Sequence, residues 1–244
     1  MGPFLNGAII AAGRGERLRA GSNDLPKPLV TVAGMTLLER QIRALLSVGV
    51  GHVGVIVNSE TARLMGPLPE TLAAVTDLCV ADTPNSMESL LTLGPKLGNG
   101  TFLLATVDSL MPAAGWRHFA AGAARVLELP ACHGVLGITR WRGEARALFA
   151  DLDADRKLIT GLTDDPREFI TAGVYAFRTS IFDCSVAARQ LGLQALRRFL
   201  AFLINRKLQL AAIEIDQVID IDVPADLAAA RRAIEDWDKG GEPR

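Results

Sequence analysis

Two short segments near the N-terminus combine a glycine loop with positive charge. Gly13-Arg14-Gly15 follows an apolar run, and Arg17 stands just beyond it. Lys27 lies between Pro26 and Pro28, which restrict its backbone to extended conformations. Glycines let main-chain N–H groups approach an anion closely, and Arg17 and Lys27 add two cations. The pattern therefore predicts a site that grips a nucleoside triphosphate.

A single carboxylate follows a later buried run. Asp108 comes directly after Phe102–Val107, which is apolar enough to be an internal strand. Ligands of open α/β sheets bind beyond the carboxyl ends of the strands, so Asp108 and the glycine loop are expected on one rim. A carboxylate beside a triphosphate site is suited to Mg²⁺, which prefers oxygen ligands.

The elements that must position these residues alternate along the chain, as in an α/β fold. Thr36 and Glu39 have capping-box spacing at the start of one helix, and Thr83-Pro84 is expected to open another. Further helices are expected at Leu193–Ile204 and Pro224–Trp237. The expected strands are Ala8–Ala12, Val53–Val57, Phe102–Val107, Gly134–Thr139, Phe169–Phe177 and Leu208–Ile215.

This alternation predicts one three-layer α/β/α domain over residues 1–238 with a mostly parallel, Rossmann-like sheet. Residues 141–168 are polar and are expected to leave the sheet on the acceptor side, and residues 239–244 are expected to be a disordered tail.

Composition narrows the class of protein. The 244 residues carry 26 Lys and Arg against 27 Asp and Glu, a formal charge of −1, which argues against nucleic acid or an anionic membrane as a partner. Cys79, Cys132 and Cys184 are widely spaced and predict neither a disulfide framework nor a zinc site. With no long apolar stretch and no signal-peptide pattern, a cytoplasmic protein is expected.

Two other interpretations of the glycine loop fit the sequence less well. Gly13-x-Gly15-x-x-Leu18 narrowly misses the dinucleotide fingerprint, which also requires an acidic residue about 20 positions further on, whereas Glu60 stands more than twice as far away. The chain contains no G-x-x-x-x-G-K-[ST] motif, which excludes a P-loop. Lys27 alone is also compatible with a solvated loop lysine, although its two prolines favour a functional role.

The same residues resemble the nucleotidyltransferases of the sugar-phosphate nucleotidylyltransferase superfamily. Their N-terminal signature, A-A-G-x-G-x-R-L/M followed by P-K-x-L, is matched by Ala11–Leu18 and Pro26–Leu29. Further similarity covers Val32–Glu39, the segment Thr171-Ala172-Gly173-Val174-Tyr175, and Ile221–Leu227, which is similar to I-D-T-P-E-D-L.

The resemblance implies transfer of a nucleoside monophosphate from a nucleoside triphosphate to a phosphorylated alcohol, polyol or sugar, with release of pyrophosphate. Arg17 would hold the leaving pyrophosphate, and Lys27 would lie against the α-phosphate. The implied nucleotide-binding loop consists of Ala11, Ala12, Gly13, Arg14 and Gly15.

The resemblance also implies a Mg²⁺ cofactor and an acceptor side. Asp108 would be the first metal ligand, with Asp222 preferred over Asp220 as the second, although Asp222 is equally suited to capping the last helix. Thr171 and Gly173 belong to the strand that lies beside the acceptor in this superfamily. The partners implied are a nucleoside triphosphate and a small phosphorylated acceptor; the oligomeric state stays open.

The nucleotide base is indicated by Asn85-Ser86-Met87-Glu88-Ser89-Leu90. This segment is similar to the N-N-x-x-S-L of phosphocholine and inositol-phosphate cytidylyltransferases, which favours CTP, with Asn85 and Ser89 bonded to base or ribose. The alternative is that Asn85 and Ser86 are ordinary first-turn residues of a helix. Two other functions stay open: a molybdenum-cofactor nucleotidyltransferase, which more often shows R-M-G and a lone lysine, and a nucleotide sensor without turnover.

Overall fold

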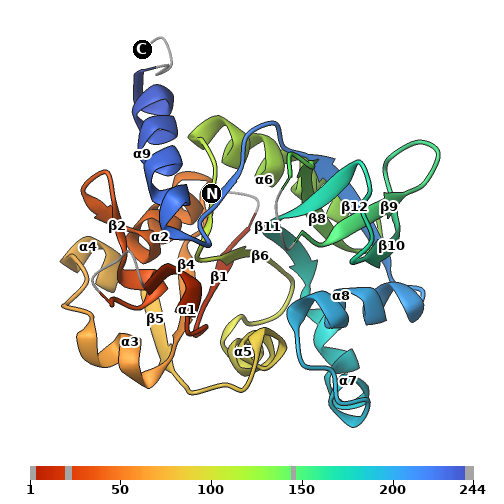
Figure 1. Cartoon of the computed structure of the whole chain (residues 1–244). Helices are drawn as coiled ribbons and strands as arrows, with labels where there is room; N and C mark the ends of the chain where they lie inside the picture. The colour runs from red at the N-terminus through yellow and green to blue at the C-terminus, as the bar shows by residue number, and fades with distance from the viewer. Residues whose placement is uncertain (1–3, 20–23, 144–146, 240–244) are drawn as a thin grey trace.

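The computed structural model describes residues 4–19, 24–143 and 147–239, and shows an α/β fold built on one nine-stranded mixed sheet. Its strands run through the middle of the molecule, with helices packed above and below (Figure 1). The single-domain α/β architecture expected from the alternating pattern is confirmed.

The half of the sheet that carries the glycine loop is parallel. Its strands lie in the order β5-β4-β1-β6 and comprise β1 (Asn6–Ala11), β4 (His52–Val57), β5 (Thr76–Val80) and β6 (Thr101–Thr106). Each of these strands ends on the same edge, so the segments after β1, β4 and β6 come together there.

The other half is mostly antiparallel. β11 (Phe169–Arg178) runs antiparallel to β6, to β8 (Cys132–Arg140) and to β9 (Phe149–Leu152), which pairs with β10 (Ile159–Thr163). β12 (Gln209–Glu214) returns to a parallel pairing with β8. A separate two-stranded ribbon joins β7 (Ser109–Leu110) to β13 (Ile219–Asp220).

Helices cover both faces because alternate side chains of each strand point to opposite sides. Ile9 packs in one apolar cluster with α2 (Leu37–Ser47), α6 (Ala113–Leu127) and α9 (Pro224–Lys239). Its neighbours Ala8 and Ile10 pack in the other, with α5 (Ser86–Leu93), α7 (Ser185–Gln190) and α8 (Leu196–Asn205). In Figure 1 the two helical groups lie on opposite sides of the strands.

Shorter elements connect these parts of the chain. They are α1 (Glu16–Arg19), η1 (Lys27–Leu29), β2 (Thr31–Val32), β3 (Met35–Thr36), α3 (Ser59–Leu64), α4 (Glu70–Ala73), η2 (Gly94–Lys96) and η3 (Thr179–Cys184). None of the helices in the described ranges has the length and apolar composition needed to cross a membrane.

Three expectations about the elements are wrong. Residues 141–168 do not leave the sheet, because β9 and β10 extend its edge as an antiparallel hairpin. The helix after β5 is capped by Asn85, whose Oδ1 accepts from Glu88 N, so Thr83-Pro84 precedes it as loop. Lys239 ends α9 and is not part of a tail; residues 240–244 lie outside the described ranges.

Candidate active site

The glycine loop after β1 is packed directly against Lys27. Gly15 has a φ of +60°, and a Cβ built on it would lie 2.7 Å from Lys27 Cβ. Glycine is therefore required here both by the left-handed backbone and by the contact. From the next strand, Asn58 caps α3 through Thr61 N and donates its Nδ2 to Ala12 O at 3.2 Å, which braces the start of the loop.

Lys27 lies at the centre of a charge cluster. Its Nζ donates to Asp108 Oδ2 at 2.8 Å and to Asp222 Oδ1 at 2.9 Å, and only 8% of the residue is exposed. Burial by itself would lower the pKa of the amine, but the two carboxylates outweigh it and raise the pKa above its ordinary value. Lys27 is therefore a fixed ammonium ion that joins the end of β6 to the segment before α9.

Arg17 completes the cluster from the other side. Its Nη2 lies 2.9 Å from Asp222 Oδ2, so Asp222 is paired with two cations. Partial burial acts to raise the pKa of Asp222, but the hydrogen bond and charge of Lys27, with Arg17 behind them, lower it below the ordinary value. The alternative interpretation of Asp222 as a helix cap is not supported, because its two carboxylate oxygens pair with Lys27 and Arg17 and Asp226 N at the start of α9 donates to Val223 O.

Asp108 and Asp220 are held together through a hydrogen-bonded turn. The N–H of Ile221 donates to Asp108 O at 3.0 Å, and Ser109 Oγ donates to Asp220 Oδ1 at 3.3 Å. Crowding by protein atoms, then the like charges of Asp108 and Asp222, raise the pKa of Asp220 to about 7, although its side chain keeps contact with solvent. Three carboxylates from two distant segments thus meet around one lysine.

A cavity of about 900 Å³ opens over this cluster, within the size range of small-molecule sites. The predicted site residues that line it are Ala11, Ala12, Gly13, Arg14, Gly15, Arg17, Lys27, Asn85, Ser89, Asp108 and Asp222. Asp220, Thr171 and Gly173 are not in its lining. Glu60, Asp82 and Thr83 also line it and were not predicted as site residues.

The two residues expected to contact the base already have structural hydrogen bonds. Asn85 Oδ1 caps α5, and the Oγ of buried Ser89 bonds Thr83 Oγ1 at 2.6 Å and Asn85 O at 3.1 Å. The cap agrees with the alternative interpretation of Asn85 as an ordinary helix-start residue. Both residues nevertheless line the same cavity as the glycine loop.

Gly173 and Thr171 both lie on β11, and Gly173 packs against the carboxylate turn. A Cβ on Gly173, whose φ is +70°, would lie 1.9 Å from Ser109 Oγ and 2.6 Å from Thr106 Oγ1, so β11 presses directly on the turn. Gly173 also lies within the segment where the pairing of β11 with β8 shifts register, between Thr171 and Tyr175. Thr171 hydrogen-bonds buried Tyr175.

The donor set suits a hard divalent cation that is shared with a substrate. Asp108 and Asp222 offer carboxylate oxygens on either side of Lys27 Nζ. The described residues contain no group of three or more His, Cys, Asp or Glu side chains able to hold a metal without help. Mg²⁺ commonly takes one or two protein carboxylates and completes its shell with phosphate oxygens and water, so these residues fit it.

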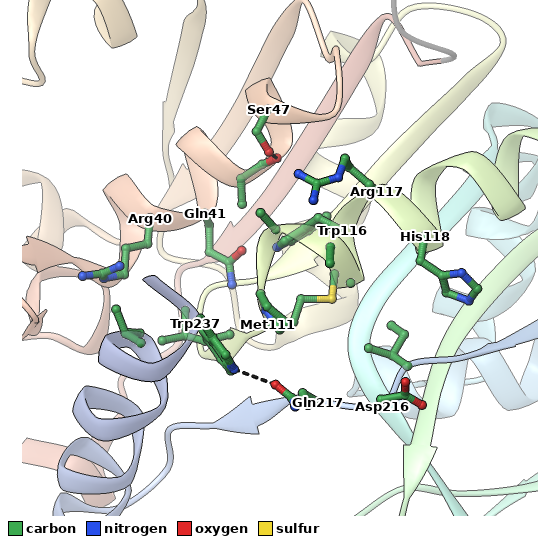
Figure 2. Close-up of a pocket in the computed structure, with 18 of the residues that line it drawn as sticks. Arg40, Gln41, Ser47, Met111, Trp116, Arg117, His118, Asp216, Gln217 and Trp237 are labelled. Atoms are coloured by element: carbon green, nitrogen blue, oxygen red, sulfur yellow. Dashed lines mark hydrogen bonds between the residues drawn. The ribbon is translucent and has the colours of Figure 1, made fainter. Parts of the chain in front are cut away.

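A second cavity, of about 1130 Å³, lies between α2, α6 and α9 (Figure 2). Trp116, Met111 and Trp237 contribute to its wall, and Trp237 Nε1 donates to Gln217 Oε1 at 2.7 Å. It shares no lining residue with the cavity above Lys27. Gln41 also lines it, is only 1% exposed, and was not among the predicted site residues.

Comparison with known proteins agrees with this geometry. Residues 7–164 match the MobA-like NTP transferase domain, a span that contains the glycine loop, Lys27 and Asp108. The chain belongs to this family. The resemblance to nucleotidyltransferases expected from the motifs is thereby confirmed.

Curated proteins match parts of the chain at low to moderate identity. A probable mannose-1-phosphate guanylyltransferase 2 of Oryza sativa subsp. japonica is 28% identical over 192 residues, which cover 72% of this chain and 50% of that protein. A bifunctional IPC transferase and DIPP synthase of Rubrobacter xylanophilus is 44% identical over 104 residues, 42% of this chain and 21% of that protein. The chain spans about half the length, or less, of these curated relatives.

Solved structures of similar fold include two CTP-dependent enzymes. The inositol-1-phosphate CTP transferase from T. maritima superposes with a TM-score of 0.80 at 16% identity, covering 99% of both chains. The CTP:phosphocholine cytidylyltransferase from Streptococcus pneumoniae superposes with a TM-score of 0.76 at 21% identity, covering 95% of this chain and 100% of that one. At these identities the superpositions establish the fold of a MobA-like domain.

Proposed function

We propose that this MobA-like domain is a nucleotidyltransferase. It transfers a nucleoside monophosphate, CMP in the first instance, from a nucleoside triphosphate to a phosphorylated alcohol, polyol or sugar. The observation that carries the proposal is the position of Lys27 Nζ, 2.8 Å from Asp108 and 2.9 Å from Asp222, beside a glycine loop. One crevice thus offers fixed positive charge for phosphates and two carboxylates for a metal ion.

In the proposed reaction, an oxygen of the acceptor phosphate forms a bond to the α-phosphorus of the triphosphate. The bond from that phosphorus to the bridging β-oxygen breaks, and pyrophosphate leaves with the electron pair. Such transfers need little covalent chemistry from the protein, so its contribution is positioning and charge neutralisation.

Different residues of the crevice contribute to positioning and to charge neutralisation. The main-chain N–H groups of Gly13 and Gly15 contact the β- and γ-phosphates, and Arg17 holds the departing pyrophosphate. Lys27 neutralises charge that accumulates at the α-phosphate; at about 4 Å and an effective dielectric constant of about 20, one such contact is worth on the order of 4 kcal/mol before desolvation.

A metal ion and the acceptor complete the proposed site. When bound, Mg²⁺ supplies neutralisation of the triphosphate charge. Asp108 and Asp222 would hold the ion, and Asp220, which accepts a hydrogen bond from Ser109, would support the turn that carries Asp108. The acceptor lies on the β11 side, where Gly173 adjoins the carboxylate turn and Thr171 stands two residues before it.

The choice of CTP rests on residues 85–90 and on similarity. Asn85 and Ser89 line the cavity at the start of α5, where a base or ribose can reach them. The relative named as an IPC transferase and the two CTP-dependent enzymes of similar fold support CTP and a polyol or alcohol phosphate. The mannose-1-phosphate guanylyltransferases support GTP and a sugar 1-phosphate.

A pyrophosphate-release assay tests the proposal. Each of CTP, GTP, UTP, ATP and dTTP is paired with inositol 1-phosphate, phosphocholine, mannose 1-phosphate and glucose 1-phosphate in the presence of MgCl₂. We expect the highest rate with CTP and an alcohol or polyol phosphate, and an NDP-linked product by mass spectrometry. If GTP gives the highest rate, the proposed nucleotide is GTP instead of CTP, and the proposed reaction stays the same.

Two outcomes point to the other candidate functions. Nucleotide binding by calorimetry with no pyrophosphate from any pair would indicate a sensor. Turnover only when molybdopterin is added as acceptor would indicate a molybdenum-cofactor nucleotidyltransferase.

A further inference from the structure

Gln41 is a buried polar side chain on an otherwise apolar helix face. It is 1% exposed, and the other buried residues of α2 are Leu37, Leu38, Ile42 and Leu45. Burying a carboxamide among apolar side chains is unfavourable unless its hydrogen-bonding groups are paired. The partners of Gln41 therefore indicate what it contributes.

Both donors of the Gln41 amide go to the turn that carries Asp108. Nε2 donates to Thr106 O at 3.1 Å and also to Ser109 O. These carbonyl groups flank Asp108, at the end of β6 and the start of β7. A neutral primary amide supplies two N–H donors from one nitrogen, whereas Glu supplies none when ionised and Met supplies none at all.

The Asp108 turn is also hydrogen-bonded to the segment that carries the other two carboxylates, Asp220 and Asp222. Asp108 O accepts from the N–H of Ile221, which stands between Asp220 and Asp222 in the chain. Ser109 Oγ donates to Asp220 Oδ1. A shift of the turn would therefore change the spacing of all three carboxylates.

The turn lies between β11 and a cavity. β11 blocks it at Gly173, where even a Cβ would meet Ser109 Oγ at 1.9 Å. On the other side lies the cavity of about 1130 Å³, and Leu110 and Met111, which follow the turn, are part of its wall. Figure 2 shows Gln41 reaching from α2 into this region beside Met111 and Trp116.

We propose that Gln41 is a positioning residue, which through its two hydrogen bonds fixes the Asp108 turn and so the spacing of the carboxylates for the metal–nucleotide complex. This role rests on the proposed function. Loss of the amide donors leaves the turn free to move toward the cavity while the glycine loop and Lys27 backbone keep their own contacts.

The test replaces Gln41 by Met, which has similar length and no donor. Arg43→Ala is the matched control, because Arg43 lies on the same helix and lines the same cavity but pairs with Glu39. Hydrogen exchange by mass spectrometry on the free proteins is the first readout. We expect residues 106–111 and 219–223 to exchange about tenfold faster in Gln41→Met, and at the wild-type rate in Arg43→Ala.

Kinetics provide the second readout. Changes around a metal site typically cost tenfold to a hundredfold in affinity or activity, so kcat of Gln41→Met is expected to fall by about that factor. The MgCl₂ concentration for half-maximal rate should rise by roughly tenfold. The KM for the acceptor should change less than about twofold, because the amide touches only the carboxylate turn.

Three results would overturn the proposal. They are unchanged exchange at residues 106–111 in folded Gln41→Met, unchanged kcat and Mg²⁺ dependence, or equal losses in every kinetic constant in step with a lower Tm. If Gln41→Met does not fold, Gln41→Asn, whose shorter amide cannot span both carbonyls, replaces it with the same expected pattern. If the wild-type protein is silent in the pyrophosphate assay, the proposed function fails, and the exchange experiment still decides whether Gln41 fixes the turn.

Discussion

Lys27 is buried to a degree that lysines rarely reach without partners. Its two carboxylate partners come from residues 81 and 195 positions away in the chain, so the ion pairs form only when the whole fold is in place. A single side chain thereby joins the start, middle and end of the sequence. The extended backbone that the two prolines predict for Lys27 is wrong, because Lys27 begins the short 3₁₀ helix η1 (Lys27–Leu29).

Replacing Lys27 by Met removes this cation at nearly constant length. We expect kcat for pyrophosphate release to fall about a hundred- to thousandfold, as for the loss of one charge-stabilising donor in other enzymes. We also expect a loss of about 1–3 kcal/mol in unfolding free energy, because Asp108 and Asp222 lose their shared partner.

Lys96→Met is the control for the loss of one positive charge, since Lys96 is exposed and lines neither of the two large cavities. Steady-state kinetics and urea denaturation measure both quantities. A Lys27→Met enzyme with near-normal turnover would exclude Lys27 from the chemistry.

Asp220 gives a prediction about pH and stability. Folding raises its pKa from 3.8 to about 7, so the folded state binds the extra proton and stability declines as the pH rises through this range. In Asp220→Asn the decline is absent, and the variant should be more stable than wild type at pH 8 but not at pH 4. Because solvent reaches the side chain, we expect only about 1 kcal/mol, or 2–4 °C in Tm.

The Asp220→Asn comparison is made by calorimetry with EDTA present, so that no divalent cation neutralises the carboxylates. Ser109 can still hydrogen-bond the amide oxygen of Asn, which keeps the turn comparable. A variant whose Tm equals that of wild type at both pH values would show that Asp220 ionises without penalty in the folded protein.

At the residue scale, sequence motifs identified the charged side chains but not what they do to each other. Arg17, Lys27 and Asp108 were named from their spacing and do meet at one cavity. That Lys27 bonds Asp108 and Asp222 depends on distances across the fold, which no local pattern contains. Gln41 left a detectable signal, a polar residue four positions from Leu37 and Leu45 on the apolar stripe of α2, and its partner carbonyls only appear in three dimensions.

Among the elements, the loop after β1 depends on its second glycine more than on its first. In Gly15→Ala the new Cβ would meet Lys27 at 2.7 Å in a left-handed backbone, whereas a Cβ on Gly13 meets nothing within 4 Å. We expect Gly15→Ala to lose about 1–3 kcal/mol of stability and to raise the KM for the triphosphate.

Gly13→Ala is the matched control and should keep the wild-type Tm to within a degree or two. Thermal denaturation and KM measurements on the two variants make the comparison. Equal effects of the two substitutions would mean that the contact between Gly15 and Lys27 does not determine the loop conformation.

Element prediction succeeded for the continuous apolar strands and for the edge strand β12, but it missed β5, β9 and β10. β1, β4 and β6 are continuous apolar runs, and each was found to within about two residues. β5 was missed because it is an edge strand, with Leu78 and Val80 exposed. β9 and β10 were missed because each is short and lies in a polar stretch, and their pairing depends on β11 rather than on their own sequence.

For the molecule as a whole, the two apolar clusters share one sheet and so should unfold together. Alternate residues of β1 belong to different clusters, so neither cluster can unfold without disrupting the strand that it shares with the other. We expect one calorimetric transition with equal calorimetric and van't Hoff enthalpies. A nucleoside triphosphate with MgCl₂ should raise its Tm as a single peak. Two transitions, only one of which responds to nucleotide, would divide the chain into separate domains.

The pairing of Lys27 with Asp108 and Asp222 has a consequence for the order in which the crevice fills. The carboxylates already have a tethered counterion, which a solitary divalent cation must displace without offering the ammonium group another anion. A cation that arrives together with its nucleotide brings the phosphates to which the displaced amine can turn. Under the proposed function, binding of the metal–nucleotide complex would therefore exchange the ion-pair partners of Lys27 rather than fill an unpaired site.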